Sequence, residues 1–304
     1  MDGEVRVCRV SPTFPNSEVP GGGLPGYYAT LNLALPTLYI TRLQGGCPFP
    51  VPAHVQLARI RYPDIELHWA SGMIARAAAL AYKLFGYGVL AIAAMPRVIR
   101  FRPHVVHLHT PIPLKVGLLA KWLLGCRLVV TIHGSELFWL RRSPVLRWGV
   151  NQADAVCFVT ESMRDELSHL LSVKALVYTP NGVDMQTFFP GEAARVPQFL
   201  AVGNFRNEKG FDVLMRAFRR VRQRFADVRL IMVGDGLGRE AVEDLAREIG
   251  IGTHVEFRGS CQRDEVAKLM RESRVFVMSS RSEGQPKVLL EAVACGTPVV
   301  VTDV

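Results

Sequence analysis

The last 24 residues of the chain, "RSEGQPKVLLEAVACGTPVVVTDV" (Arg281–Val304), contain a turn, an apolar helix and an apolar strand. Pro286 suits the first position of that helix, because the N–H that proline lacks would have no partner there. The backbone amides at a helix start carry partial positive charge, which suits a diphosphate. The residues predicted to form this seat are Gly284, Gln285, Pro286, Lys287 and Val288.

Two glutamates bracket the start of the helix. Glu283 precedes it, and Glu291 lies about five residues inside it, roughly 7.5 Å along the axis. A carboxylate accepts hydrogen bonds from a pair of vicinal hydroxyl groups. One carboxylate on each side of a bound diphosphate therefore suits a sugar nucleotide, with the sugar on one side and the ribose on the other. The spacing alone is equally compatible with two solvated surface glutamates.

Short apolar runs alternate with helical stretches along most of the chain. Such a pattern predicts parallel sheets that are covered on both faces. The linker Thr179–Pro197 separates two series of these units. The predicted fold is α/β, with two tandem doubly wound Rossmann-like domains, residues 1–180 and 181–304, that face a ligand cleft. The expected strands are 105–109, 127–134, 155–160, 175–182, 198–203, 228–234, 254–259, 275–280 and 298–302.

The composition is that of a globular protein, with 49% apolar and 21% charged residues. The net charge of +9 lies mainly in residues 1–180, which hold 18 Lys and Arg against 10 Asp and Glu. A basic domain favours an anionic partner. The basic residues have no interleaved aromatic stripe, which argues against nucleic acid. The six cysteines form no Cys-x-x-Cys pair, which favours reduced thiols in the cytoplasm.

The longest apolar stretch, Leu84–Pro96, is too short to span a bilayer. It is followed by Arg97, Arg100 and Arg102. A helix of this kind is either part of the core or lies on an anionic membrane surface. Residues 84–102 are therefore the candidate contact between a cytoplasmic, peripheral protein and the inner face of a membrane.

Three histidines and one glutamate near the ends of the expected strands are candidates for a metal site or for catalysis. His107 and His109 share one face of a strand, and His133 follows the next strand, so the three are candidates for a metal site. Histidines that orient loops or a sugar are the favoured interpretation. Glu136 is interpreted as a residue at a helix start and not as a catalytic acid.

Several motifs stand in an order that resembles a known family. "SEGQPKVLLEAVACGTPVV" resembles the Glu-x7-Glu signature of glycosyltransferase family 4, the group 1 glycosyltransferases with the GT-B fold. "PNGVD" (Pro180–Asp184) is similar to the inter-domain turn of that family. Val202–Phe218 and Val233–Ala246 are similar to the first two strand–loop–helix segments of its donor domain, and "VVHLHTP" and "VVTIHGSE" to its acceptor domain.

The resemblance implies roles for individual residues. Glu283 would bind hydroxyl groups of the donor sugar, Glu291 the ribose of the nucleotide, and Lys209 the diphosphate. The family often has an arginine at the position of Asn204, and Arg206, two residues on, would supply that charge instead. The remaining implied contacts are His133 at the 6-hydroxyl of the donor sugar, Gly22 and Gly23 of a Gly-rich loop near the diphosphate, and Ser260 and Cys261 at the base.

The implied activity is retaining hexosyl transfer from a UDP- or GDP-linked sugar to a glycan or lipid-linked acceptor of the cell envelope, without a cofactor. The chain has no Asp-x-Asp sequence, so Lys209, Arg206 and the helix start would stabilise the leaving diphosphate in place of a metal ion. Two alternatives stay open. One is another GT-B enzyme, such as a sugar-nucleotide epimerase or a phosphorylase, and the other is an inactive nucleotide-sugar-binding fragment.

The chain ends directly after the expected strand Pro298–Thr302, where members of the family continue with a further turn, a strand and helices. The resemblance therefore predicts an incomplete second domain and a truncated chain. Little or no turnover is expected of the 304-residue form.

Overall fold

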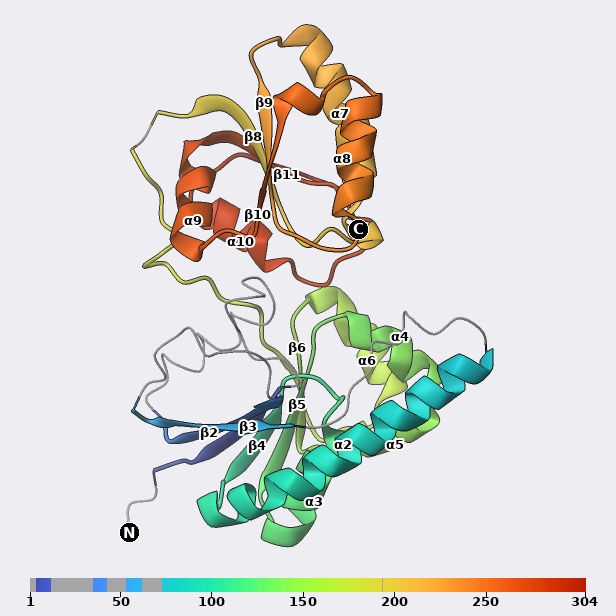
Figure 1. Ribbon diagram of the computed structural model, residues 1–304. Helices are drawn as coiled ribbons and strands as arrows, with labels where there is room; N and C mark the ends of the chain where they lie inside the picture. The colour runs from blue at the N-terminus through green and yellow to red at the C-terminus, as the bar shows by residue number, and fades with distance from the viewer. Residues whose placement is uncertain (1–3, 12–34, 43–52, 62–72, 193) are drawn as a thin grey trace. The chain divides into compact units, whose positions relative to one another are not determined.

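The computed structural model describes residues 4–11, 35–42, 53–61, 73–192 and 194–304. The chain divides into two compact units, with Pro180 in the first and Asn181 in the second. Each unit contains one parallel β-sheet and its covering helices (Figure 1). The predicted fold class, α/β with two Rossmann-like sheets, is confirmed.

The first unit contains a seven-stranded sheet with the order β3-β2-β1-β4-β5-β6-β7. The chain runs outward from β1 through β2 to β3 and then returns to β4 on the other side of β1. The strand order therefore reverses between β1 and β4, where open α/β sheets bind ligands at their carboxyl edge. The strands are β1 (Val7–Val10), β2 (Thr37–Arg42), β3 (Val55–Ile60), β4 (Val105–Leu108), β5 (Arg127–Ile132), β6 (Ala155–Phe158) and β7 (Leu176–Tyr178).

The described helices of the first unit pack on one face of this sheet (Figure 1). Alternate strand residues, among them Val10, Leu108 and Val130, are fully buried beneath them. None of the helices that the structure describes is both long and apolar enough to cross a membrane. The helices are α2 (Met73–Phe101), α3 (Leu114–Leu124), α4 (Ser135–Arg142), α5 (Pro144–Val150) and α6 (Arg164–Leu170), with the 3₁₀ turn η2 (Glu161–Met163) before α6.

The second unit contains a five-stranded parallel sheet with the order β10-β9-β8-β11-β12 and helices on both faces (Figure 1). Helices α7 (Phe211–Arg224) and α8 (Arg239–Glu248) cover one apolar core, and α9 (Arg263–Glu272) and α10 (Lys287–Ala294) cover another. The strands are β8 (Val196–Val202), β9 (Arg229–Val233), β10 (Val255–Gly259), β11 (Ser273–Met278) and β12 (Val299–Val301), and the 3₁₀ turns are η3 (Asn207–Lys209) and η4 (Gly252–His254).

The structure corrects the sequence interpretation at three places. The helical spacing of apolar residues in Leu137–Val150 predicts a single helix, but the structure has two, α4 and α5. Pro144 starts the second helix, and the Ser143 hydroxyl accepts a hydrogen bond from the Leu146 N–H at 3.1 Å. Pro286 caps α10 and is not its first helical residue. Strands β2 and β3 lie in a region that the sequence pattern left unassigned.

Candidate functional site

Two loops of the second unit meet where β8 and β11 end. Gly210, between η3 and α7, has a φ of +61°, and a Cβ atom there would lie 2.1 Å from the carbonyl oxygen of Ser279. Only glycine tolerates both the positive φ and the close approach. The Ser279 hydroxyl then donates a hydrogen bond to the carbonyl oxygen of Lys209 at 2.9 Å. The glycine thereby brings Lys209 against the segment that follows β11.

Lys209 and Glu283 form an ion pair at this junction. The Lys209 Nζ atom lies 2.6 Å from Glu283 Oε1, and the two side chains are 25% and 14% exposed. The Ser280 hydroxyl donates to the same carboxylate oxygen at 2.6 Å. The structure therefore joins two residues that the resemblance assigned to the diphosphate and the sugar. Glu283 thereby balances the charge of Lys209 within the chain.

Helix α10 begins beside this pair, and Gln285 fixes its start. The N–H of Asn181 donates to the Gln285 side-chain oxygen, and the Asn181 side-chain amide donates to the Gln285 carbonyl oxygen at 3.0 Å. Pro286 has an extended ψ of 112°, and the helix follows at once. The Leu289 and Leu290 amides donate to the carbonyl oxygen of Pro286, whereas the amides of Lys287 and Val288 have no acceptor within the helix. Asn181 thus holds the start of α10 in place, where the sequence predicts an anion seat.

Glu291 lies further inside α10 and faces cations. Its Oε1 atom is 3.8 Å from Arg263 of α9, and Arg263 is also 3.4 Å from Asp184. Burial raises the pKa of Glu291, while Arg263 and Lys287 act against this shift. Burial lowers the pKa of Lys287 to about 8. Sequence reasoning missed Arg263 and gave no role to Asp184, although Asp184 belongs to the "PNGVD" motif.

The other predicted residues of the second unit lie on its loops. Asn204 and Arg206 are exposed on the loop after β8, and the Arg206 N–H donates to the Asn204 carbonyl oxygen at 2.8 Å. Ser260 is exposed and Cys261 is half-buried directly after β10. Burial raises the pKa of the Cys261 thiol. Among the described residues, no side-chain hydrogen bond joins these four to the Lys209–Glu283 pair.

His133 belongs to the first unit and follows β5. Its backbone N–H donates to a carboxylate oxygen of Glu136 at 3.0 Å, and Glu136 is buried in the first turn of α4. This contact confirms the interpretation of Glu136 as a helix-start residue. Gly22 and Gly23 lie outside the residues that the structure describes.

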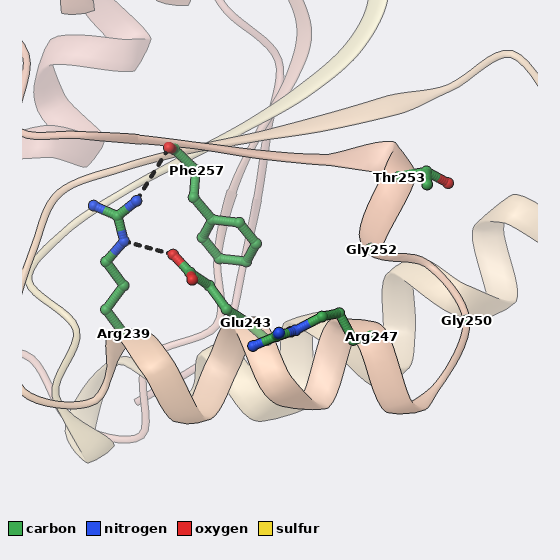
Figure 2. Close-up of a pocket in the computed structure, with 7 residues that line it drawn as sticks. All are labelled: Arg239, Glu243, Arg247, Gly250, Gly252, Thr253 and Phe257. Carbon is green, nitrogen blue, oxygen red and sulfur yellow. Dashed lines mark hydrogen bonds and ion pairs between the residues drawn. The ribbon is translucent and has the colours of Figure 1, made fainter.

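An open groove runs beside α8 and the edge strand β10 (Figure 2). Arg239 spans it, with its Nε atom 2.6 Å from Glu243 and a terminal nitrogen 3.3 Å from the carbonyl oxygen of Phe257. None of the predicted site residues lines this groove. Its residues are Arg239, Glu243, Arg247, Gly250, Gly252, Thr253 and Phe257.

Two known family models match consecutive parts of the chain. Residues 62–187 match the family model described as "Glycosyltransferase Family 4", and residues 185–304 match "Glycosyl transferases group 1". The chain belongs to the group 1 glycosyltransferases of family 4.

Two individual relatives are also similar to the chain. The chain is 28% identical to the N-acetyl-alpha-D-glucosaminyl L-malate synthase of Bacillus anthracis, over 94% of this chain and 76% of that protein. It is 32% identical to a GDP-mannose-dependent alpha-(1-6)-phosphatidylinositol monomannoside mannosyltransferase of Mycolicibacterium smegmatis, over 61% of this chain. That match spans about half, 54%, of the mannosyltransferase.

Among solved structures, a sucrose-phosphate synthase from Thermosynechococcus elongatus resembles this chain with a TM-score of 0.78. The match covers 99% of this chain and 82% of that chain at 20% sequence identity. At this level of identity the likeness shows the shared fold.

Proposed function

We propose that the chain is a retaining, metal-independent glycosyltransferase that moves a sugar from a UDP- or GDP-linked donor to a glycan or lipid-linked acceptor. The observation that carries the proposal is the Lys209–Glu283 pair at the start of α10. The pair places a cation, a carboxylate and a set of helix amides together, which are the groups that a sugar diphosphate needs. Family membership and the nucleotide-sugar donor named for the mycobacterial relative support the same class of reaction.

The chemistry follows from charge. Cleavage of the bond between the sugar C1 and the phosphate oxygen builds negative charge on the diphosphate. Lys209 and the first amides of α10 stabilise that charge, as preorganised donors do in other transfer enzymes. The acceptor oxygen bonds to C1 from the same face, and its proton passes to the leaving phosphate. Glu283 holds hydroxyl groups of the sugar, so no covalent intermediate on the protein is required.

The nucleotide occupies the other side of the helix start. Glu291 is held near Arg263, and its carboxylate accepts hydrogen bonds from the ribose hydroxyl groups. The base lies towards Ser260 and Cys261, at the end of β10. The choice between uracil and guanine is made by backbone groups of that segment.

The test is a panel of nucleotide sugars offered to the purified chain with lipid-linked and soluble acceptors, read by mass spectrometry and by NMR of the new glycosidic bond. Slow turnover is sufficient for this test: one donor should give a product whose anomeric configuration matches that of the donor. An inverted product would refute retention. Free epimerised sugar nucleotide, with no acceptor product, would refute transfer.

The acceptor side of the proposal includes contact with an anionic membrane surface through residues 84–102. One face of α2 packs in the core, where Leu90, Ala94 and Val98 are buried. The opposite face exposes Phe85 (63%) and Ile92 (74%) at a spacing of seven residues, which places them on one stripe. Arg97 and Arg100 are exposed on the same helix. An apolar stripe beside arginines suits an anionic interface.

Flotation with vesicles tests this contact. Wild-type protein is expected to float with phosphatidylglycerol vesicles and to be released as salt rises. A Phe85→Ser/Ile92→Ser variant should lose most of this binding. Val213→Ser, which changes an exposed apolar residue of α7, is the matched control. Equal flotation of all three proteins would refute the proposed surface.

A further inference from the structure

The sheet of the first unit has a polar row on the face opposite its described helices. Cys8 and Val10 of β1 are buried with the helices, so Arg9 lies on the other face. The strand register places Arg9 opposite Tyr39 of β2 on one side and opposite His107 of β4 on the other. This row crosses the point between β1 and β4 where the strand order reverses.

Histidine and hydroxyl groups extend the row toward the carboxyl edge of the sheet. His107 Nε2 lies 2.8 Å from the Thr131 hydroxyl of β5. The His109 ring stacks on His107 with 4.4 Å between centroids, and on Tyr39 with 6.4 Å. His107 and His109 are partly exposed, so the cluster can be reached from solvent.

No residue that the structure describes supplies a negative charge to balance the positive charge of Arg9. The residue is only 9% exposed, and its Nε atom is buried without a hydrogen-bond partner. Within the described ranges no carboxylate lies at ion-pair distance from it. Burial lowers the pKa of Arg9, which reflects the free energy that the buried charge costs.

The neighbours of Arg9 do not offer a compensating negative charge. Burial, together with the charges of Arg9 and His133, lowers the pKa of His107 to about 3, so His107 is neutral at pH 7. Burial raises the pKa of Tyr39 to about 12, so its hydroxyl stays protonated. The cluster is therefore a set of uncharged polar groups around one buried cation.

We propose that the cluster of Arg9, Tyr39, His107, His109 and Thr131 binds an anionic group, a carboxylate or a phosphate, carried by the acceptor. The proposal rests on the proposed function and specifies the acceptor's chemical class. A guanidinium binds carboxylate and phosphate with two parallel hydrogen bonds, and a bound anion balances the buried charge. The part of the chain that the structure describes has no group of three residues placed to hold a metal ion, and the arginine charge disfavours a cation.

Calorimetry with inorganic phosphate and with succinate separates the two kinds of anion. The titrations are made with saturating UDP and, in parallel, with saturating GDP, so that the donor site does not bind the probe. We expect one of the two anions to bind the wild-type chain saturably. Arg9→Gln should weaken that binding tenfold or more, on the scale of a lost charge-assisted hydrogen bond. Arg61→Gln, an exposed arginine just after β3, should bind like wild type.

NMR of the histidine rings locates the anion without a mutation, and it decides the matter if Arg9→Gln does not fold. The resonances of His107 and His109 should move on titration with the anion that binds, while that of His254 in the second unit stays fixed. Absence of saturable binding by both anions, or unchanged binding in a folded Arg9→Gln protein, would overturn the inference. The inference would also be overturned if the resonances of His107 and His109 did not shift on titration with the anion. Because nucleotide binding is measured separately, a chain that binds UDP or GDP but neither anion refutes only this inference.

Discussion

The geometry of the ion pair between Lys209 and Glu283 predicts the coupling free energy that a double-mutant cycle of Lys209→Met and Glu283→Gln should measure. The Lys209 Nζ atom is 2.6 Å from Glu283 Oε1, and both side chains are less than a third exposed. A hydrogen bond between charged groups contributes about 1.5–3 kcal/mol. In the Lys209→Met variant the Ser280 hydroxyl still donates a hydrogen bond to the Glu283 carboxylate, so the carboxylate keeps part of its stabilisation. We therefore expect a coupling free energy of about 2 kcal/mol between the two positions.

Urea unfolding measures this coupling in the second unit, and the chain supplies its own control. All four tryptophans, Trp69, Trp122, Trp139 and Trp148, belong to the first unit. Tryptophan fluorescence therefore reports the first unit, and far-UV circular dichroism reports both. The four proteins of the cycle should share one fluorescence midpoint, while the second dichroism transition shifts. A coupling below about 0.5 kcal/mol, the usual error of additivity, would show that the pair does not stabilise the unit.

Three further outcomes are expected. Glu291→Gln should weaken nucleotide binding about tenfold in calorimetry, because ribose loses a charged acceptor, while Glu248→Gln at the exposed end of α8 should not. Lys287 has a pKa of about 8 against an ordinary 10.5, so the unfolded chain binds more protons between these values. Unfolding free energy should then rise by up to about 3 kcal/mol from pH 8 to pH 10.5 in wild type, and a flat profile relative to Lys287→Met would contradict this. Transfer should survive EDTA, since Lys209 and the amides of α10 meet the charge of the leaving group, and loss of transfer that magnesium or manganese restores would disprove metal independence.

Strands with uninterrupted apolar runs were predictable from the sequence. Arg229–Val233 is buried on both faces beyond its first residue, whereas Val105–Leu108 and Arg127–Ile132 bury one face completely and the other in part. Short apolar runs of this kind distinguish strands without knowledge of the tertiary structure. Strands β2 and β3 alternate apolar and polar residues next to proline-rich segments, so their pattern did not separate them from loops. The break at Pro144 was missed because the apolar residues on either side keep a helical spacing.

The sequence indicates individual residues of the candidate site but not the contacts between them. The turn and helix start around Glu283 have local sequence signals, namely glycine, proline and the spacing to Glu291. The partner of Glu283 lies 74 residues earlier, and only the packing of the η3 loop on the end of β11 shows that it is Lys209. Arg263 has no local signal, since its role depends on α9 packing beside α10.

The internal partner of Lys209 bears on how the donor is selected. A lysine poised for phosphate would otherwise be partly buried without a counter-charge, and Glu283 removes that penalty in the ligand-free chain. Inorganic phosphate can bind Lys209 only by displacing the Glu283 carboxylate, which is then left without a cation. The net free energy gained when phosphate binds is therefore small. Under the proposed function, a sugar diphosphate gives Lys209 a new anion and at the same time gives Glu283 the hydroxyl groups of the sugar. Glu283→Gln should therefore tighten the binding of free UDP or GDP relative to the sugar nucleotide. A variant that weakens both ligands equally would show that Glu283 does not compete for Lys209.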